Sequence, residues 1–315
     1  MAARFSKLPP EAAAKITRRT ASLSVAVAIL LIILKAGAWL ASGSVAMLSS
    51  LADSTLDLAA SFFTMLAVRY AATPPDREHR FGHGKAEAFA GLFQAGLVAV
   101  SALMIVVEAA SHLLNPIKLQ HETSAIAVML ISIAATSLLV WAQTRAIAAT
   151  GSVATSGDRA HYGSDLAANV VVIAGIGASA LWGWRWADGV AGIVVAGWLV
   201  WSAWHIAQAA AEHLMDHEMP NADRDRIRAL AMADGKIKDV HDLRTRMSGP
   251  YVHVQFHADM DPNLTLDDAH HIIVEAENRI RAAYPAADLI IHPDPGDRAE
   301  PHGHEYFAEG HRAAS

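Results

Sequence analysis

The stretch SSLADSTLDLAASFF, residues 49–63, decides the fold, because it places two carboxylates inside a segment apolar enough to cross a bilayer. Asp53 and Asp57 are four residues apart, so on a helix they share one face, one turn from each other. An aspartate at the centre of a membrane helix costs about 2.5 to 3.5 kcal/mol on insertion scales, so such groups are rare unless they are paired, hydrated or bound to an ion. We therefore interpret both as functional.

A second stretch, HYGSDLAAN at residues 161–169, repeats this spacing with His161 and Asp165. Four nitrogen and oxygen ligands on two helices suit a divalent metal. A ligand set without thiolates fits Zn²⁺, and Fe²⁺, Mn²⁺, Co²⁺ and Cd²⁺ remain open on ligand type alone. The alternative is a buried hydrogen-bonded network that holds no metal.

The composition is typical of a membrane protein. Charged residues make up 18% of the chain and hydrophobic residues 53%, with a mean hydropathy of +0.26, whereas soluble domains are roughly 25% charged. There is no cysteine, which excludes disulfides and thiolate sites, so histidines and carboxylates must hold any metal. We find no nucleotide-binding motif that would indicate ATP-driven transport.

Six segments reach the length of about 20 residues that a membrane span needs, namely residues 20–42, 45–71, 87–113, 123–148, 155–182 and 188–211. Residues 1–19 are polar and basic, and they do not resemble a cleavable signal. Lysine and arginine gather before the first span and in the connections from the second to the third and the fourth to the fifth. The positive-inside rule then predicts that both termini are cytoplasmic, and at 1.5 Å per residue the two ligand pairs reach overlapping depths near the midplane.

The chain becomes polar after about residue 212, which predicts a soluble cytoplasmic domain over residues 212–295. Its pattern predicts helices at 221–233 and 265–283 and strands at 239–247, 250–258 and 287–292. An α-β-β-α-β order in about 80 residues is consistent with a small open sheet with helices on one face. We expect the histidine-containing tail, residues 296–315, to be disordered.

Histidines cluster in this second domain in a way that composition alone would not predict. They are His241, His257, His270 and His292, and Asp294 follows the last of them. These side chains could converge on a metal site, or each could be an ordinary surface residue.

The connection PPDREHRFGHGKAE, residues 74–87, offers Asp76, His79 and His83. The two histidines are four residues apart, but the glycines around the second disfavour a stable helix. A solvated loop without metal is therefore the alternative to a metal site.

Five motifs in order resemble those of the cation diffusion facilitator family, particularly its bacterial ferrous iron and zinc efflux branch: SSLADSTLD, HRFGHGKAE, HYGSDLAAN, HDLRTRMSGP and IIHPDP. The resemblance covers nearly the whole chain. It implies a homodimer in the bacterial inner membrane, with six membrane helices and a metallochaperone-like cytoplasmic domain in each protomer. It also implies exchange of a cytoplasmic divalent metal for external protons, without an organic cofactor, a nucleotide or a nucleic acid partner.

The resemblance also implies roles for residues. It implies a transport site of Asp53, Asp57, His161 and Asp165, a set that the family associates with zinc and cadmium rather than manganese. It implies a loop site of Asp76, His79 and His83, and a binuclear cytoplasmic site of His241, His257, His270, His292 and Asp294 that bridges or braces the dimer. Lys85 and Asp216 match a charged pair that ties the two domains together near the dimer interface.

We accordingly predict a secondary active transporter rather than an enzyme, a Zn²⁺/H⁺ antiporter that works by alternating access. His161 is the predicted proton carrier, because an imidazole titrates near neutral pH and must be neutral to bind metal. A membrane-anchored metal sensor is the alternative, although a sensor would have no need of costly ligands at the midplane. An intramembrane metalloprotease would show an HExxH motif, which this chain lacks.

Overall fold

The computed structural model describes residues 8–42, 45–114, 123–182 and 187–296. The described chain forms two compact units, the first reaching to His217 and including Met247–Tyr251, the second comprising Glu218–Arg246 and the chain from Val252 onward. We call them the membrane unit and the carboxy-terminal unit, and each is described by itself. The predicted disorder of the tail concerns residues that lie, apart from Gly296, outside the described part.

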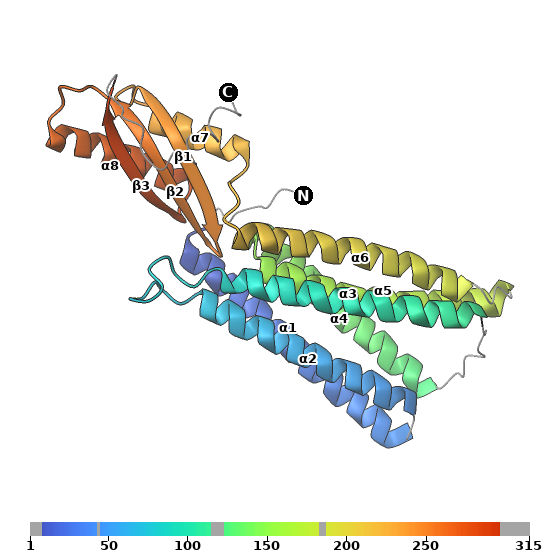
Figure 1. The fold of residues 1–315 in the computed structure, drawn as a ribbon. Helices are drawn as coiled ribbons and strands as arrows, with labels where there is room; N and C mark the ends of the chain where they lie inside the picture. The colour runs from blue at the N-terminus through green and yellow to red at the C-terminus, as the bar shows by residue number, and fades with distance from the viewer. Residues whose placement is uncertain (1–7, 43–44, 115–122, 183–186, 297–315) are drawn as a thin grey trace. The chain divides into compact units, whose positions relative to one another are not determined.

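Six long helices make up the membrane unit (Figure 1), namely α1 (Pro10–Ser42), α2 (Val45–Ala71), α3 (Ala86–Leu114), α4 (Thr123–Thr150), α5 (Val153–Trp182) and α6 (Ala187–Leu214). They correspond to the six predicted spans. The first begins at Pro10 rather than at residue 20, and proline is favoured at the first position of a helix because that N–H has no helical partner. Among the described residues, all but α5 are long and apolar enough by composition to cross a membrane.

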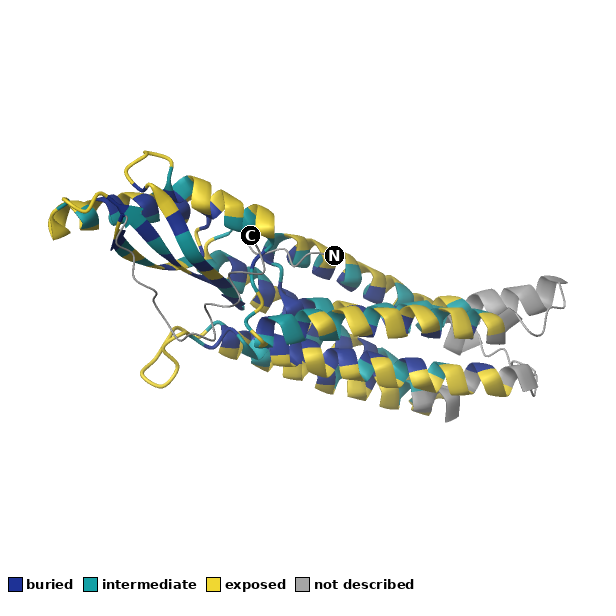
Figure 2. Ribbon diagram, turned by 45° about the horizontal axis from the view of Figure 1, so that its top comes forward, coloured by how far each residue is buried: buried dark blue, intermediate teal, exposed yellow. Residues whose placement is uncertain are grey.

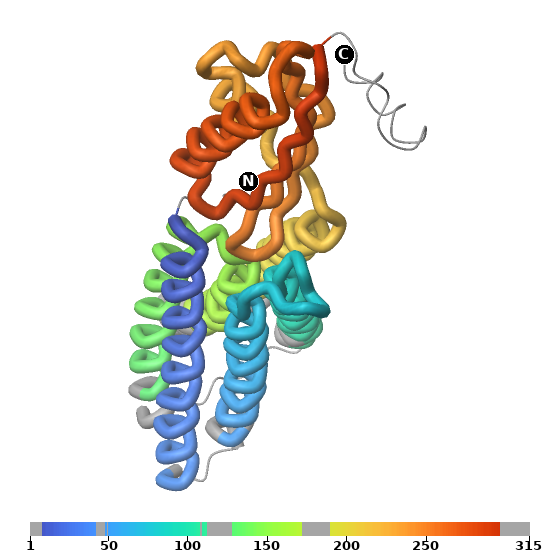
Figure 3. Tube along the Cα trace, turned by 90° about the vertical axis from the view of Figure 1, so that its left-hand side faces the viewer, coloured from blue at the N-terminus to red at the C-terminus, as the bar shows by residue number. Residues whose placement is uncertain are grey.

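The helices pack around α5, which contacts α3, α4 and α6, while α1 lies against α2 and α4 (Figure 3). Small residues allow the close approach of α3 to α5. A Cβ atom on Gly157 would lie 2.7 Å from the Cβ of Gln94, and one on Gly91 would lie 2.6 Å from Val153 Cγ1. Close approach through small residues is characteristic of helix packing in membranes.

The outer faces of these helices are exposed (Figure 2), and many of the exposed residues are large and apolar. Ile33, Leu56, Leu103 and Trp204 are each more than 60% exposed. A soluble protein rarely presents so much contiguous apolar surface, so these faces indicate contact with lipid.

The carboxy-terminal unit consists of α7 (Asn221–Ala231), β1 (Asp239–Ser248), β2 (Tyr251–Met260), α8 (Leu266–Ala283) and β3 (Ala287–Pro295). This confirms the predicted α-β-β-α-β order. The sheet order is β1-β2-β3, with β2 and β3 parallel, so the chain returns through α8. As predicted, Thr265 opens α8, and its side chain accepts a hydrogen bond from the backbone N–H of Asp268.

Candidate metal sites

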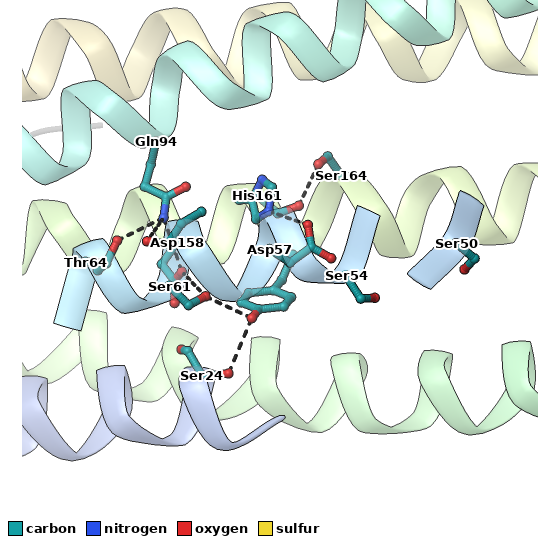
Figure 4. Close-up of polar contacts among 12 residues, drawn as sticks. Ser24, Ser50, Ser54, Asp57, Ser61, Thr64, Gln94, Asp158, His161 and Ser164 are labelled. Carbon is teal, nitrogen blue, oxygen red and sulfur yellow. Dashed lines mark hydrogen bonds and ion pairs between the residues drawn. The ribbon is translucent and has the colours of Figure 1, made fainter. Parts of the chain in front are cut away.

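The membrane site forms where α2 and α5 meet. Nε2 of His161 lies 3.0 Å from Oδ1 of Asp57, and Figure 4 draws the two side chains facing each other. Asp57, His161 and Asp165 each offer a ligand atom, and the three atoms lie within 4.8 Å of one another. The structure thus brings three of the four predicted transport ligands together from two distant segments.

His161 is 6% exposed, and its Nδ1 is buried with no hydrogen-bond partner among the described residues. Leaving a buried polar nitrogen unpaired costs about 1 to 3 kcal/mol. The pairing of the other ring nitrogen with a carboxylate and the proximity of a second carboxylate fit the donor set that zinc prefers. The residues present therefore suit a divalent metal as the transported substrate.

Asp53 lies one turn from Asp57 on α2, but it is exposed and is not part of the three-residue group. Next to it, Ser54 accepts a hydrogen bond from Nζ of Lys35 at 2.7 Å, and Lys35 also donates to the carbonyl of Ser50 at 3.2 Å. The membership of Asp53 in the transport site stays a prediction.

A second polar cluster surrounds Asp158, one turn from His161 toward the start of α5 (Figure 4). The carboxyl group is 1% exposed. It accepts hydrogen bonds from Ser61 Oγ at 3.1 Å, from Gln143 Nε2 at 2.8 Å and from Gln94 Nε2 at 3.4 Å. Asp158 therefore joins α5 to α2, α3 and α4.

Tyr162 and Ser24 extend this Asp158 cluster to α1. The hydroxyl of Tyr162 lies 2.9 Å from Ser61 Oγ and donates to the carbonyl of Ser24 at 3.3 Å. Among the described residues, every hydrogen-bond donor to Asp158 is neutral, whereas ionisable groups in membrane helices often pair with one another. This cluster was not predicted from the sequence, although a second acidic residue in the span at 155–182 was a signal that could have found Asp158.

The loop site forms in the connection from α2 to α3. Asp76 Oδ1 is 3.4 Å from His79 Nδ1, and Asp76 Oδ2 is 3.4 Å from His83 Nε2. The backbone N–H groups of His79 and Glu78 donate to Asp76 and hold the pKa of its carboxyl below the ordinary value. His83 is nearly buried, with its ring against that of Tyr70. All three predicted ligands thus converge.

In the carboxy-terminal unit, histidines converge on one buried carboxylate. Asp294, 3% exposed, has Oδ2 at 2.9 Å from Nδ1 of His257 and 3.3 Å from Nε2 of His241, while its Oδ1 is 3.3 Å from Nε2 of His292. His270 is exposed on α8 and is not part of this group.

Strand register explains why these residues meet. Side chains two apart on a strand share a face, and the parallel pairing sets His257 opposite His292 and Asp259 opposite Asp294. On β1, His241 stands beside this row, with its Nδ1 3.6 Å from Asp259 Oδ1. Asp239, Asp259 and His241 also each offer a ligand atom, and these atoms lie within 4.8 Å of one another. Neither aspartate was predicted from the sequence.

Comparison with known proteins follows the same division of the chain. A family model described as the cation efflux transmembrane domain matches residues 21–215, and one described as the cytoplasmic domain of cation efflux proteins matches residues 219–296. The chain belongs to the cation diffusion facilitator family. It is therefore an integral membrane protein of a transporter family rather than an enzyme.

Relatives of this family member are similar over most of their length. The cation-efflux pump FieF of Shewanella oneidensis is 40% identical over 272 residues, which cover 86% of this chain and 92% of that protein. FieF of Klebsiella pneumoniae subsp. pneumoniae is 37% identical over 281 residues, or 89% and 93% of the two chains. A solved structure of CzrB in its zinc form is 30% identical, covers 27% of this chain and 99% of its own, and has a TM-score of 0.26.

Within the membrane unit of this family member, Lys85 and Asp216 form an ion pair with Nζ 2.9 Å from Oδ1. Nζ also donates to the carbonyl of Leu214 at 3.3 Å. The pair joins the start of α3 to the end of α6, where Asp216 adopts a left-handed backbone conformation with φ of 57°. Its predicted part in tying two domains together near a dimer interface stays a prediction.

Proposed function

We propose that this cation diffusion facilitator exports Zn²⁺ from the cytoplasm in exchange for protons. The observation that carries the proposal is the group of Asp57, His161 and Asp165, whose ligand atoms lie within 4.8 Å of one another inside a helical membrane unit. Asp53, one turn from Asp57, would supply a fourth ligand and complete the tetrahedral set that zinc prefers. Cadmium, iron, cobalt and manganese compete on the same donors, so cavity shape also decides selectivity.

Proton exchange follows from the identity of the ligands. Metal and protons compete for the same lone pairs on His161 and the carboxylates, so binding of one favours release of the other. His161 is the proposed proton carrier, because an imidazole changes charge near neutral pH. Alternating access then requires only that the site open to each side in turn, with metal loaded inside and displaced by protons outside.

The two other metal sites have supporting roles in this proposal. The loop site, at the connection from α2 to α3, would collect metal at the cytoplasmic face. The site around Asp294 would bind metal and brace a homodimer through the carboxy-terminal unit. The protein is proposed to lie in the bacterial inner membrane with both termini in the cytoplasm. The reason for this orientation is that lysine and arginine cluster before the first span and in the connections from the second to the third and the fourth to the fifth.

A membrane-anchored metal sensor remains the second candidate, and the converging histidines around Asp294 favour it specifically. A sensor would bind zinc there without moving it across the membrane. The intramembrane group opposes this reading, because ionisable groups at that depth are costly to retain without a use.

Zinc flux into proteoliposomes with an imposed pH gradient separates the two candidates. The native protein is compared with Asp57→Ala and with Asp267→Ala, whose side chain is 86% exposed on α8. We expect gradient-dependent flux in the native protein and in Asp267→Ala, and none in Asp57→Ala. Tight zinc binding by a native protein that carries no flux would favour the sensor and overturn the transporter.

A further inference from the structure

A hollow of about 370 Å³ opens on the surface of the membrane unit, over α5. We call it the α5 groove. Its wall comes from α5, flanked by α4 and α6, and its lining includes Val140, Ala160, Gly163, Val170, Trp198 and Ser202. Val170 and Trp198 are about half exposed, with 52% and 49% of their surface accessible. The groove therefore opens outward to the lipid rather than into the bundle.

The groove is apolar along its length and cationic toward one end. Arg159 lines it six residues after the start of α5, about 9 Å along the helix, and Val170 lies about 16 Å farther. Arg159 is exposed, and within the described chain no hydrogen bond or ion pair engages its guanidinium group. An exposed cation thus lies at the end of the α5 groove that is nearer the start of α5.

We propose that the α5 groove binds one anionic phospholipid, with an acyl chain along Gly163 and Val170 and the phosphate at Arg159. A guanidinium group can donate two parallel hydrogen bonds to the oxygens of one phosphate. Basic pockets between membrane helices also bind anionic lipid headgroups. A second helix is 10 to 12 Å across with its side chains, whereas a hollow of this volume suits a flexible hydrocarbon chain better.

Arg145, on α4, provides a contrast. Its guanidinium lies 4.4 Å from the ring centroid of Trp141 on the same helix, α4, so an aromatic face already contacts it. Arg145 is exposed like Arg159 but does not line the groove. It is the matched charge control.

The groove shares a helix with the candidate transport ligands. His161 and Asp165 lie on α5 at positions that do not line the groove, whereas Ala160, Gly163 and Ala167 do. A bound acyl chain would brace the helix that positions both ligands. This consequence for transport rests on the proposed function, but lipid binding does not, so the test below reads binding alone.

The test is native mass spectrometry of the full chain released from mixed vesicles of phosphatidylcholine and phosphatidylglycerol. We expect the native protein to retain phosphatidylglycerol in preference to phosphatidylcholine. Arg159→Gln should lower that retention about five-fold, the effect of one basic residue near an anionic surface, while Arg145→Gln should retain it. Addition of sn-glycerol 3-phosphate should displace little lipid, because it has the charge without the chain.

A second pair of variants tests the apolar part of the groove. A Cβ atom on Gly163 or on Gly96 would meet nothing within 4 Å, so a side chain can leave the backbone at either position without a clash at Cβ, but of the two only Gly163 lines the groove. Gly163→Leu should lose bound phosphatidylglycerol and Gly96→Leu should keep it. If Gly163→Leu fails to fold, Arg159→Gln alone decides.

Three results would overturn the proposal. They are equal retention of the two lipids by the native protein, unchanged retention in Arg159→Gln, and displacement of the lipid by sn-glycerol 3-phosphate. Loss of a dimer rather than of lipid in Arg159→Gln would instead assign the groove to a second copy of the chain.

Discussion

Nε2 of His161 and Oδ1 of Asp57 lie 3.0 Å apart although 104 residues separate them in the chain. This contact joins α5 to α2. It lies among the ionisable side chains that the sequence analysis predicts near the membrane midplane, where burying a charge costs the most free energy. In the proposed mechanism, the nitrogen that faces the carboxylate would be the atom for which metal and protons compete.

Replacement of His161 by Asp should weaken proton coupling and broaden metal choice. An all-carboxylate site favours harder ions such as Mn²⁺ over Zn²⁺, and it lacks a group that changes charge near neutral pH. Metal flux into proteoliposomes, measured for both ions at several pH gradients, checks this. Unchanged zinc preference together with unchanged gradient dependence would count against the proposed role.

Replacement of Asp158 should lower the stability of the membrane unit. Asp158→Leu removes the acceptor that Ser61, Gln94 and Gln143 share. Each donor keeps at least one other partner, so we expect a loss of about 1 to 3 kcal/mol in all. Asp158→Asn keeps one carbonyl acceptor and should lose about half as much stability. Thermal unfolding of the detergent-solubilised protein measures both. Equal stability of the native protein and Asp158→Leu would mean that the cluster is not structural.

The sequence predicted the helices because long apolar segments are a local signal. It predicted that Asp57, His161 and Asp165 meet because an ionisable residue in such a segment is a local signal too, whereas the place of Asp53 stays a prediction. The Asp158 cluster escaped prediction because its donors come from three other helices and glutamine and serine carry no charge. Similarly, the alternating pattern of β2 and β3 predicts two strands, but no local signal pairs His257 with His292 rather than with a neighbour. The exposed position of His270 also depends on how α8 rotates against the sheet.

The loop site should lose zinc in Asp76→Asn to the same extent at about pH 6 and about pH 7.5. Hydrogen bonds from the backbone of His79 and Glu78 lower the pKa of the Asp76 carboxyl in the folded loop. The stability that its charge gives the loop is therefore present above the ordinary pKa of about 3.9 and lost only as the pH falls below it. Asp76 thus remains an anion across this range.

Zinc titration of a variant that lacks the other two sites measures this effect, with Glu78→Gln as the control. Glu78 is exposed in the same loop and is not a member of the ligand group. An Asp76→Asn effect that vanished at the lower pH while the native loop still bound zinc would contradict a carboxylate that stays ionised across this range.

Asp294→Asn should remove zinc-dependent stabilisation of the carboxy-terminal unit, because Asp294 contacts three histidines and is almost fully buried. His270→Ala should have a much smaller effect on the first zinc bound, since His270 lies outside the group. Thermal unfolding of the full protein with and without zinc compares the two. A larger loss in His270→Ala would indicate that another chain brings this histidine to the site.

Tyr284→Phe should lower stability by about 1 kcal/mol near neutral pH, and the difference from the native protein should shrink in strong base. Burial of Tyr284 and its hydrogen bond to Asp223 Oδ1, 2.9 Å long, raise its pKa to about 12 from an ordinary value of 10.0. A raised folded pKa means that the stabilisation is complete below about pH 10 and is lost as the pH rises through about 12. Thermal midpoints of native protein and variant, measured from about pH 8 to about pH 11, follow this convergence.

Tyr251→Phe, at a half-buried residue on β2, is the control, and its difference from the native protein should stay small throughout. A Tyr284→Phe difference that grew with pH would reverse the sign of the linkage and place the stabilisation in the ionised form.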